Sequence, residues 1–256
     1  MGNNMKVAIV GFGKMGKNIL SVMEEMGDEA AAIIDPISAD GRVTHRVLNA
    51  ESVKDADVII DFSHPSSAMD NMIMYSHLGI PAVVGTTGWY SEKDKLISLL
   101  GEDAKILYSG NFSIGVAMFL KTVGFASRLM NKASEYDVSL REVHHTAKAD
   151  SPSGTALMIA DQIISGMDRK SEVLWGNSEG RIAPEALQIT SERVGFEPGL
   201  HEVTFDSPAD TITLRHHARS REGFARGAVA VARWLTATEK KGLLTLDDYI
   251  SELLGE

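Results

Sequence analysis

Two adjacent histidines, a lysine and an aspartate lie within seven residues of one another, at His144, His145, Lys148 and Asp150. A histidine titrates near neutral pH and a lysine is a mobile proton donor, so these residue types together suit acid–base catalysis. The cluster is therefore a candidate site of proton transfer. A charged surface loop is the alternative interpretation.

A helix is predicted to begin at the end of this cluster, close to Ser153. The first backbone N–H groups of a helix lack partners within it, so those of Gly154 and Thr155 could bind a carboxylate. Ser153 is also a residue type that caps helices, and a simple cap is the alternative interpretation of this segment.

Metal binding is a second chemistry to consider, because His144, His145 and Asp150 are possible ligands. Adjacent histidines on a strand point to opposite faces, and the sequence has neither an H-E-x-x-H motif nor a cysteine. We therefore expect no metal site.

A glycine-rich turn lies near the N-terminus, where Gly11, Gly13 and Gly16 form the pattern G-x-G-x-x-G between a predicted strand and a predicted helix. In dinucleotide-binding folds such glycines make the tight turn, admit the pyrophosphate and let the helix pack on the strand. An acid at the end of the next strand binds a ribose hydroxyl, and Asp35 stands 19 positions after Gly16. The pattern predicts a nicotinamide dinucleotide site, with an ordinary βα turn as the alternative.

Asp35 also bears on the choice of cofactor, because a carboxylate that accepts from the ribose 2′-hydroxyl repels a 2′-phosphate. We therefore expect NADH to be favoured over NADPH. Lys14, Lys17 and Arg42 could supply compensating positive charge, or could be solvated surface residues.

Two further turns follow predicted strands, Gly85-Thr86-Thr87-Gly88 after the fourth and Ser109-Gly110-Asn111-Phe112 after the fifth. Ligands of open α/β sheets bind beyond the carboxyl ends of the strands, and small residues there would let the backbone approach a nicotinamide. Ordinary turns are the alternative.

The elements that must position these residues change character along the chain. Strands and helices alternate over residues 1–111, as in a doubly wound parallel sheet, and closely spaced alternating strands follow, as in a mixed sheet with one face covered. We expect an α/β protein with an N-terminal Rossmann domain, residues 1–111 plus 222–256, and an α+β substrate-binding domain, residues 112–221. The predicted strands are 5–10, 29–35, 57–62, 80–84, 104–109, 135–143, 187–194, 201–206 and 211–217, and the predicted helices are 14–26, 66–77, 91–100, 112–132, 153–167, 221–238 and 246–254.

The composition excludes several classes of partner. The formal net charge of −10 opposes binding to a phosphate backbone, so no nucleic acid is expected. No stretch approaches the ~20 apolar residues of a membrane span, and no basic segment leads into a long apolar run. Because cysteine is absent, a reducing compartment is the simplest interpretation, and we expect a cytoplasmic protein.

Five of the eight histidines lie in the second predicted domain. The arginines near them in the sequence are Arg215, Arg219, Arg221 and Arg226. This concentration of basic residues predicts a pocket for a doubly negative small molecule, although His201 and His217 could instead be core histidines.

Together these motifs resemble those of the 4-hydroxy-tetrahydrodipicolinate reductase family, also called the dihydrodipicolinate reductase family. The most specific motif is His144-His145-x-x-Lys148-x-Asp150-x-Pro152-Ser153-Gly154-Thr155, whereas the glycine motif alone is shared by many dehydrogenases. The likeness spans the chain, and it includes Gly199-x-His201 before a strand and His217 with Arg221 before an alanine-rich helix.

The resemblance implies NAD(P)H-dependent reduction of (2S,4S)-4-hydroxy-2,3,4,5-tetrahydrodipicolinate to tetrahydrodipicolinate, in diaminopimelate and lysine biosynthesis. It implies that His144 donates or accepts a proton and that Lys148 donates one. The implied substrate-binding residues are His145, Ser153, Gly154 and Thr155, and the implied cofactor-binding residues are Gly11, Phe12, Gly13, Lys14, Met15, Gly16, Asp35, Gly85, Thr86, Thr87, Ser109, Gly110, Asn111 and Phe112. Family members are usually homotetramers joined through the sheets of the second domain.

Two departures from the family pattern weigh against a preference for NADPH. Pro36 follows Asp35 where many members have a basic residue, and Lys14 stands where many have arginine. Another small Rossmann amino-acid dehydrogenase, such as an aspartate dehydrogenase, is the alternative enzyme. A catalytically silent dinucleotide sensor is the alternative outside enzymes, and the presence of both His144 and Lys148 disfavours it.

Overall fold

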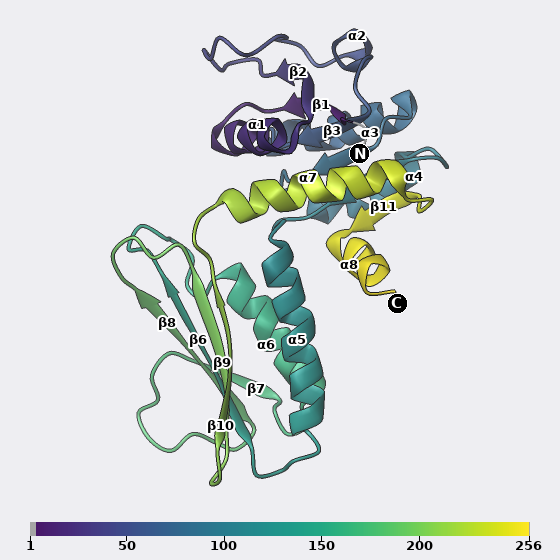
Figure 1. Cartoon of the computed structure of the whole chain (residues 1–256). Helices are drawn as coiled ribbons and strands as arrows, with labels where there is room; N and C mark the ends of the chain where they lie inside the picture. Colours follow the sequence, from purple (N-terminus) through teal and green to yellow (C-terminus); the bar gives the residue numbers. More distant parts are fainter. Residues whose placement is uncertain (1–3, 256) are drawn as a thin grey trace. The chain divides into compact units, whose positions relative to one another are not determined.

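The computed structural model describes residues 4–255, and this part of the chain forms two compact units. Unit 1 comprises the chain up to Ser113 and the segment from Glu222 onward, and unit 2 is Ile114–Arg221. Each unit is built on its own β-sheet (Figure 1).

Unit 1 contains a six-stranded parallel sheet with the strand order β11-β5-β4-β3-β1-β2. Its strands are β1 (Lys6–Val10), β2 (Glu29–Ile34), β3 (Val58–Asp61), β4 (Ala82–Val84), β5 (Lys105–Tyr108) and β11 (Gly242–Thr245). Its helices are α1 (Lys14–Met26), α2 (Ala50–Val53), α3 (Pro65–Leu78), α4 (Lys93–Leu99), α7 (Glu222–Ala237) and α8 (Leu246–Leu254), with a 3-10 turn at Tyr90–Glu92. The strand order reverses at β1, so the predicted doubly wound sheet is confirmed.

Helices cover both faces of this sheet, which explains why its strands are apolar at almost every position. Val7 and Ile9 of β1 contribute to the core on the side of α1 and α7. Ala8 and Val10 contribute to the core on the side of α3 and α4. The carboxyl ends of the strands are thereby held at one rigid edge, where the candidate cofactor residues lie.

Two elements of unit 1 are not predicted by the sequence pattern. The strand β11 pairs in parallel with β5 along its four residues and extends the edge of the sheet. The helix α2 has only four residues, and its N-terminus is capped by reciprocal hydrogen bonds between Asn49 and Ser52. Both elements are too short to display a periodicity of their own.

Unit 2 contains a five-stranded mixed sheet with the strand order β10-β9-β6-β8-β7. Its strands are β6 (Asp137–His144), β7 (Glu172–Trp175), β8 (Ala186–Arg193), β9 (Leu200–Asp206) and β10 (Thr211–His217), and its helices are α5 (Ile114–Met130) and α6 (Gly154–Gly166). The central strand β6 pairs antiparallel with β9 and parallel with β8. The predicted mixed sheet is confirmed, while the short strand β7 is a further element that the pattern does not predict.

The helices α5 and α6 lie side by side against one face of this sheet (Figure 1). On β6, Val138 and Leu140 are buried toward these helices, whereas Arg141 is exposed on the other face. Because side chains alternate along a strand, Glu142 and His144 also point to the covered face, and both are buried.

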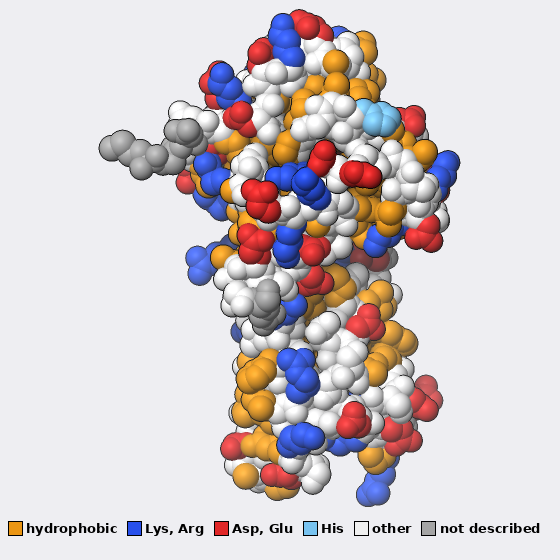
Figure 2. All heavy atoms as spheres, turned by 90° about the vertical axis from the view of Figure 1, so that its right-hand side faces the viewer, with side chains coloured by type: hydrophobic (Ala, Val, Ile, Leu, Met, Phe, Trp, Pro, Cys, Tyr) orange, Lys and Arg blue, Asp and Glu red, His pale blue; other side chains and the backbone are white. Residues whose placement is uncertain are grey.

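The surface carries charges of both signs. On the face shown in Figure 2, basic and acidic side chains are interspersed, and no continuous basic surface is visible there. Among residues 4–255, no helix has the length and apolar character needed to cross a membrane.

Candidate active site

The glycine turn of unit 1 follows β1 and is held closely by its neighbours. The N–H of Gly11 donates to the carbonyl of Ile34 at 2.9 Å, and its left-handed φ of 86° favours glycine. A Cβ on Gly16 would lie 2.2 Å from the carbonyl oxygen of Gly11, so only glycine allows α1 to pack this close to the turn.

Gly13 has no such packing role. It is the N-cap residue of α1, and nothing lies within 4 Å of the position that a Cβ would occupy. Backbone N–H groups at a helix N-terminus attract anions, and the open space beside Gly13 gives a phosphate room to approach them. The turn therefore fits the pyrophosphate of a dinucleotide.

Asp35 follows β2, and its buried carboxylate is bonded to the glycine turn. Its Oδ2 accepts from the N–H of Phe12 at 2.7 Å, and its Oδ1 accepts from those of Ile37 and Ser38 at 2.9 and 2.7 Å. Burial favours a higher pKa for Asp35, but these donors and the charge of Arg46 lower the pKa below its ordinary value. The group is therefore a negative charge placed at the end of β2.

The basic side chains near Asp35 have partners of their own. Asp40 pairs with Lys17 at 3.0 Å and with Arg42 at 2.9 Å, so an acid offsets both cations. Arg46, which the sequence pattern does not single out, donates to the backbone carbonyl of Asp35 at 3.2 Å. Lys14 is exposed at the start of α1.

The turns after β4 and β5 approach each other. A methyl of Thr87 lies 3.5 Å from the position of a Cβ on Gly110. Gly85 donates to the carbonyl of Asp61 at 2.8 Å, and the hydroxyl of Thr86 donates to the Asp61 carboxylate at 3.3 Å. The end of β3 therefore holds the turn after β4 in place.

The remaining predicted cofactor residues close the turn after β5 or pack their side chains into the core. Ser109 accepts from the N–H of Asn111 at 3.1 Å and donates to its carbonyl at 2.7 Å, which closes the turn after β5. Phe12 and Phe112 are buried, and Met15 packs against the core. The structure thus brings the predicted cofactor residues to the carboxyl ends of the strands of unit 1.

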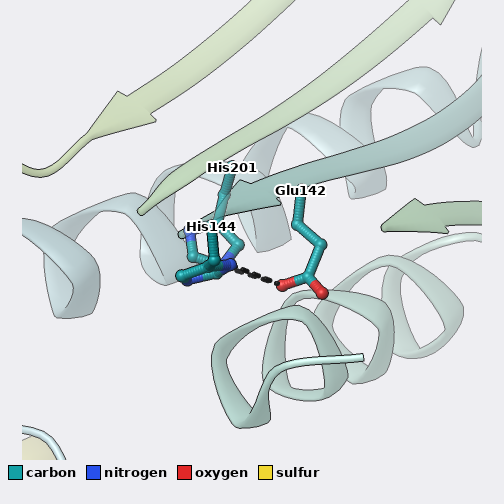
Figure 3. A group of neighbouring side chains, drawn as sticks. All are labelled: Glu142, His144 and His201. Atoms are coloured by element: carbon teal, nitrogen blue, oxygen red, sulfur yellow. Dashed lines mark ion pairs between the residues drawn. The ribbon is translucent and has the colours of Figure 1, made fainter. Parts of the chain in front are cut away.

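In unit 2, His144 ends β6 and is buried beside Glu142 and His201 (Figure 3). Its Nδ1 lies 3.3 Å from Oε2 of Glu142, and its ring centre lies 5.2 Å from that of His201. Burial lowers the pKa of His144 to about 4, the carboxylate of Glu142 opposes this shift, and nearby positive groups including Lys148 add to it. The ring is therefore neutral near neutral pH when no ligand is present.

Lys148 lies in the loop between β6 and α6, and its ammonium pairs with both carboxylate oxygens of Asp150, at 2.7 and 2.9 Å. The Lys148 hydrogen bond lowers the pKa of Asp150, burial opposes the shift, and the backbone N–H of Gly154 contributes to the lowering. A carboxylate is thus held between a lysine and the first turn of α6. The same kinds of group, an ammonium and the backbone N–H groups of a helix N-terminus, bind a substrate carboxylate.

The structure supports the capping interpretation of Ser153. This buried residue accepts from the N–H of Ala156 at 3.1 Å, and its own N–H donates to Oε1 of Glu142 at 3.0 Å. Its Oγ lies 3.1 Å from Nε2 of His201, so the side chain is engaged within the protein. Ser153 therefore fixes the start of α6.

The other predicted substrate-binding residues are more accessible. His145 directly follows β6 and Thr155 lies in the first turn of α6; both are half-buried, and Gly154 is exposed. A ligand at the first turn of α6 could reach them.

Two of the expected arginines have other partners, and an arginine that was not expected lies beside Glu142. Arg215 is on the uncovered face of the unit 2 sheet, 3.9 Å from Glu202. Arg226 is in α7 of unit 1, paired with Glu25 at 2.5 Å and Glu222 at 2.6 Å. Arg193, at the end of β8, donates to the carbonyl of Asp150 at 2.7 Å. This hydrogen bond holds the loop between β6 and α6 against the end of β8.

A cation could in geometric terms bind Glu142, His144 and His201, whose ligand atoms lie within 4.8 Å of one another among the described residues. Arg193 also donates to Oε1 of Glu142 at 3.2 Å, and its positive charge opposes a metal ion there. The absence of a metal site stays a prediction. The motifs do not include Glu142. It stands two residues before His144 on β6, however, and this spacing places both side chains on the same face of the sheet.

A doubly wound sheet with a glycine turn, in one chain with a mixed-sheet unit that carries an acid–base cluster, defines the class of two-domain dinucleotide-dependent oxidoreductases. Residues 5–112 match the family model described as dihydrodipicolinate reductase, N-terminus, and residues 115–250 match its C-terminus counterpart. The chain belongs to the dihydrodipicolinate reductase family.

Relatives of known name agree with this assignment. The 4-hydroxy-tetrahydrodipicolinate reductase of Christiangramia forsetii is 34% identical over 250 residues, which cover 97% of this chain and 99% of the relative. The enzyme of the same name from Archaeoglobus fulgidus is 35% identical over 259 residues, covering 96% and 100%. The resemblance predicted from the motifs is confirmed.

Solved structures share the fold. The dipicolinate-bound dihydrodipicolinate reductase from Paenisporosarcina sp. TG-14 is similar with a TM-score of 0.77 and 24% identity, covering 94% of this chain and 97% of that one. Aspartate dehydrogenase from Thermotoga maritima reaches a TM-score of 0.51 at 12% identity, covering 93% and 98%. The alternative of an aspartate dehydrogenase is not favoured, because both halves of the chain match the dihydrodipicolinate reductase models.

Proposed function

We propose that this chain reduces 4-hydroxy-tetrahydrodipicolinate to tetrahydrodipicolinate with a nicotinamide dinucleotide, in the synthesis of diaminopimelate and lysine. The observation that carries the proposal is the site in unit 2. There, Lys148 and the start of α6 hold the carboxylate of Asp150, in a loop that begins after the buried His144. Membership of the family supports the reaction.

The reaction combines loss of water, transfer of a hydride and transfer of a proton. Overall, the substrate loses its 4-hydroxyl group as water and gains a hydride and a proton. The bound reduced nicotinamide supplies the hydride. Addition of hydride to a ring carbon conjugated with the imine leaves an enamine, which must be protonated.

Lys148 and His144 are the groups that we assign to proton transfer. The Lys148 ammonium can stabilise a negatively charged substrate and donate a proton to it. His144 is neutral before the substrate binds, but the negative charge of a dicarboxylate raises the pKa of a nearby imidazole. Substrate binding therefore favours the protonated form that can act as an acid.

The function can be tested in cells that lack their own enzyme for this step and require added diaminopimelate. Expression of the chain should restore growth without the supplement, whereas the His144→Ala and Lys148→Ala variants should fail to do so. Failure of the unaltered, well-expressed chain would contradict the proposal.

We expect His145→Ala and Thr155→Ala to raise KM more than they lower kcat. The reason is that a group that binds a substrate carboxylate stabilises ground state and transition state alike. Steady-state kinetics would separate the two constants, with Ser171→Ala, an exposed serine of the same unit, as the control. A loss confined to kcat would reassign these residues to the chemical step.

We also propose that NADH binds at least as tightly as NADPH, because Asp35 is charged and Asp40 offsets the cations Lys17 and Arg42. The Asp40→Asn variant frees Lys17 and Arg42, so it should strengthen NADPH binding relative to NADH by about fivefold. Titration calorimetry with both cofactors would measure this, and Asp94→Asn in α4 removes an equal charge as a control. A tenfold preference of the unaltered chain for NADPH, about 1.4 kcal/mol, would contradict the proposal.

For the assembly and location, we propose a cytoplasmic homotetramer. The uncovered face of the unit 2 sheet carries opposite charges, with Arg141 bonded to Glu192 at 2.6 Å and Arg215 3.9 Å from Glu202. Such pairs can be self-complementary across a two-fold axis. The absence of cysteine and the need for reduced nicotinamide support a cytoplasmic location.

A further inference from the structure

The least exposed charge in unit 2 belongs to Glu142, whose side chain is wholly buried at the carboxyl end of β6. A buried carboxylate is costly unless donors surround it. Burial raises the pKa of such a group, but the nearby His201 and hydrogen bonds from Ser153 and Ser191 lower the pKa of Glu142 well below its ordinary value. The residue is therefore a permanent negative charge beneath the histidine cluster.

One oxygen of this carboxylate is saturated. Oε1 of Glu142 accepts from the N–H of Ser153 at 3.0 Å, from the hydroxyl of Ser191 at 2.7 Å and from the guanidinium of Arg193 at 3.2 Å. These donors come from the start of α6 and from β8, so they fix the orientation of the carboxylate on two sides.

The other oxygen faces the histidines (Figure 3). Oε2 of Glu142 and Nδ1 of His144 lie 3.3 Å apart, within ion-pair distance, and among the described residues neither atom has a hydrogen-bond partner. Nε2 of His201 is 3.7 Å from the same oxygen but already has Ser153 as a partner. A proton on Nδ1 of His144 is the arrangement that satisfies both buried atoms at once.

Glycine leaves room on the opposite side of the ring. A Cβ on Gly199 would lie 3.0 Å from Nε2 of His144, and Gly199 adopts a φ of 151° that is unfavourable for other residues. The backbone of Gly199 thus lies beside Nε2, whereas Nδ1 faces the carboxylate of Glu142.

We propose that Glu142 is a positioning residue that keeps the proton of neutral His144 on Nδ1, so that Nε2 is the ring atom that exchanges protons during the reaction. The first part concerns only the resting protein, while the second rests on the role proposed for His144. Because Oε1 also anchors Ser153, the same carboxylate aligns the histidine with the first turn of α6.

The Glu142→Gln variant gives a sharp test, because glutamine has a single oxygen. The three donors that now bond to Oε1 will hydrogen-bond to the single oxygen of the glutamine. The amide NH₂ is then left facing Nδ1 of His144. Nδ1 must then accept a hydrogen bond, and the proton must move to Nε2.

The measurement is a two-bond proton–nitrogen NMR correlation of the histidine rings in the full chain, labelled with ¹⁵N and free of ligand. His144 is assigned by the signal missing from His144→Ala. We expect the Nδ1–H tautomer in the unaltered chain and in Glu142→Asp, and the Nε2–H tautomer in Glu142→Gln. Glu192→Gln is the matched control, because it removes a carboxylate bonded to Arg141, on the neighbouring strand, and should leave His144 unchanged.

An Nε2–H tautomer of His144 in the unaltered chain would overturn the proposal, and this holds even if Glu142→Gln fails to fold. An unchanged tautomer in folded Glu142→Gln would overturn it as well. Where the tautomer changes, kcat should fall by about 10²- to 10⁴-fold without loss of dinucleotide affinity. A changed tautomer with normal kcat would support the placement of the proton by Glu142 and refute the catalytic role of His144.

Discussion

The His144→Ala and Lys148→Ala variants will each lower kcat by about 10²- to 10⁴-fold, the contribution typical of a positioned proton donor or acceptor. Both residues lie in unit 2, whereas the glycine turn and Asp35 lie in unit 1. Dinucleotide affinity should therefore change little. Steady-state kinetics at saturating substrate, combined with calorimetric titration of NADH, would measure the two effects separately.

Two matched controls keep this prediction specific. Lys132→Ala in unit 2 and His77→Ala in unit 1 remove exposed side chains of the same types and should leave kcat unchanged. If His144 and Lys148 serve one protonation event, the double variant should lose less than the product of the single losses. A near-normal kcat in either single variant would remove that residue from the proposed mechanism.

The second large effect is expected in the glycine turn, where two glycines should fail in different ways. Gly16→Ala places a Cβ 2.2 Å from the carbonyl oxygen of Gly11, so the variant should lose about 1–3 kcal/mol of stability together with dinucleotide binding. Gly13→Ala has open space around the new methyl group and should keep its stability. It should nevertheless bind NADH at least about tenfold more weakly, because the methyl group occupies the approach of the pyrophosphate.

Chemical denaturation and calorimetry on both variants would check this separation. Gly41→Ala, also in unit 1 with no atom within 4 Å of the new Cβ, is the control for the loss of a glycine. Normal NADH affinity in Gly13→Ala would contradict the assignment of this turn to the pyrophosphate.

The fold could be predicted wherever an element is long enough to repeat a pattern. The helix α8 matches its predicted range, and α1 does so because Ile19, Val22 and Met23 recur at helical spacing on a buried face. The strands β7 and β11 have four residues each and, unlike the equally short β3 and β5, lie outside the regular alternation of strands and helices over residues 1–111, so nothing in the pattern marks them as strands. Pairing with β8 and β5, respectively, is what makes them strands.

The candidate site could be predicted only where its residues are adjacent in the sequence. The motif from His144 to Thr155 lies in one loop and one helix start, and the structure keeps these together. His201 joins the cluster only because β9 pairs with β6, which sets Glu142 opposite His201. Long-range register of this kind is not encoded in local periodicity.

The electrostatic detail was the least predictable part. Sequence position groups Arg226 with the histidines, yet it lies in α7 of unit 1, whereas Arg193, which no motif includes, lies beside Glu142. Likewise, the proximity of Arg46 to Asp35 depends on how the chain returns after β2. Such pairs follow from tertiary packing, so sequence spacing gave no basis for ranking them.

The most direct test of the central claim is a spectrophotometric assay in which the synthase that produces 4-hydroxy-tetrahydrodipicolinate supplies the substrate, with NADH and NADPH in parallel. We predict that the purified chain consumes reduced cofactor only when the synthase product forms, at least as efficiently with NADH as with NADPH, and that His144→Ala and Lys148→Ala abolish most of the signal. No consumption of either cofactor with the synthase product, or instead a reduction of NAD with aspartate as the only substrate, would contradict the account.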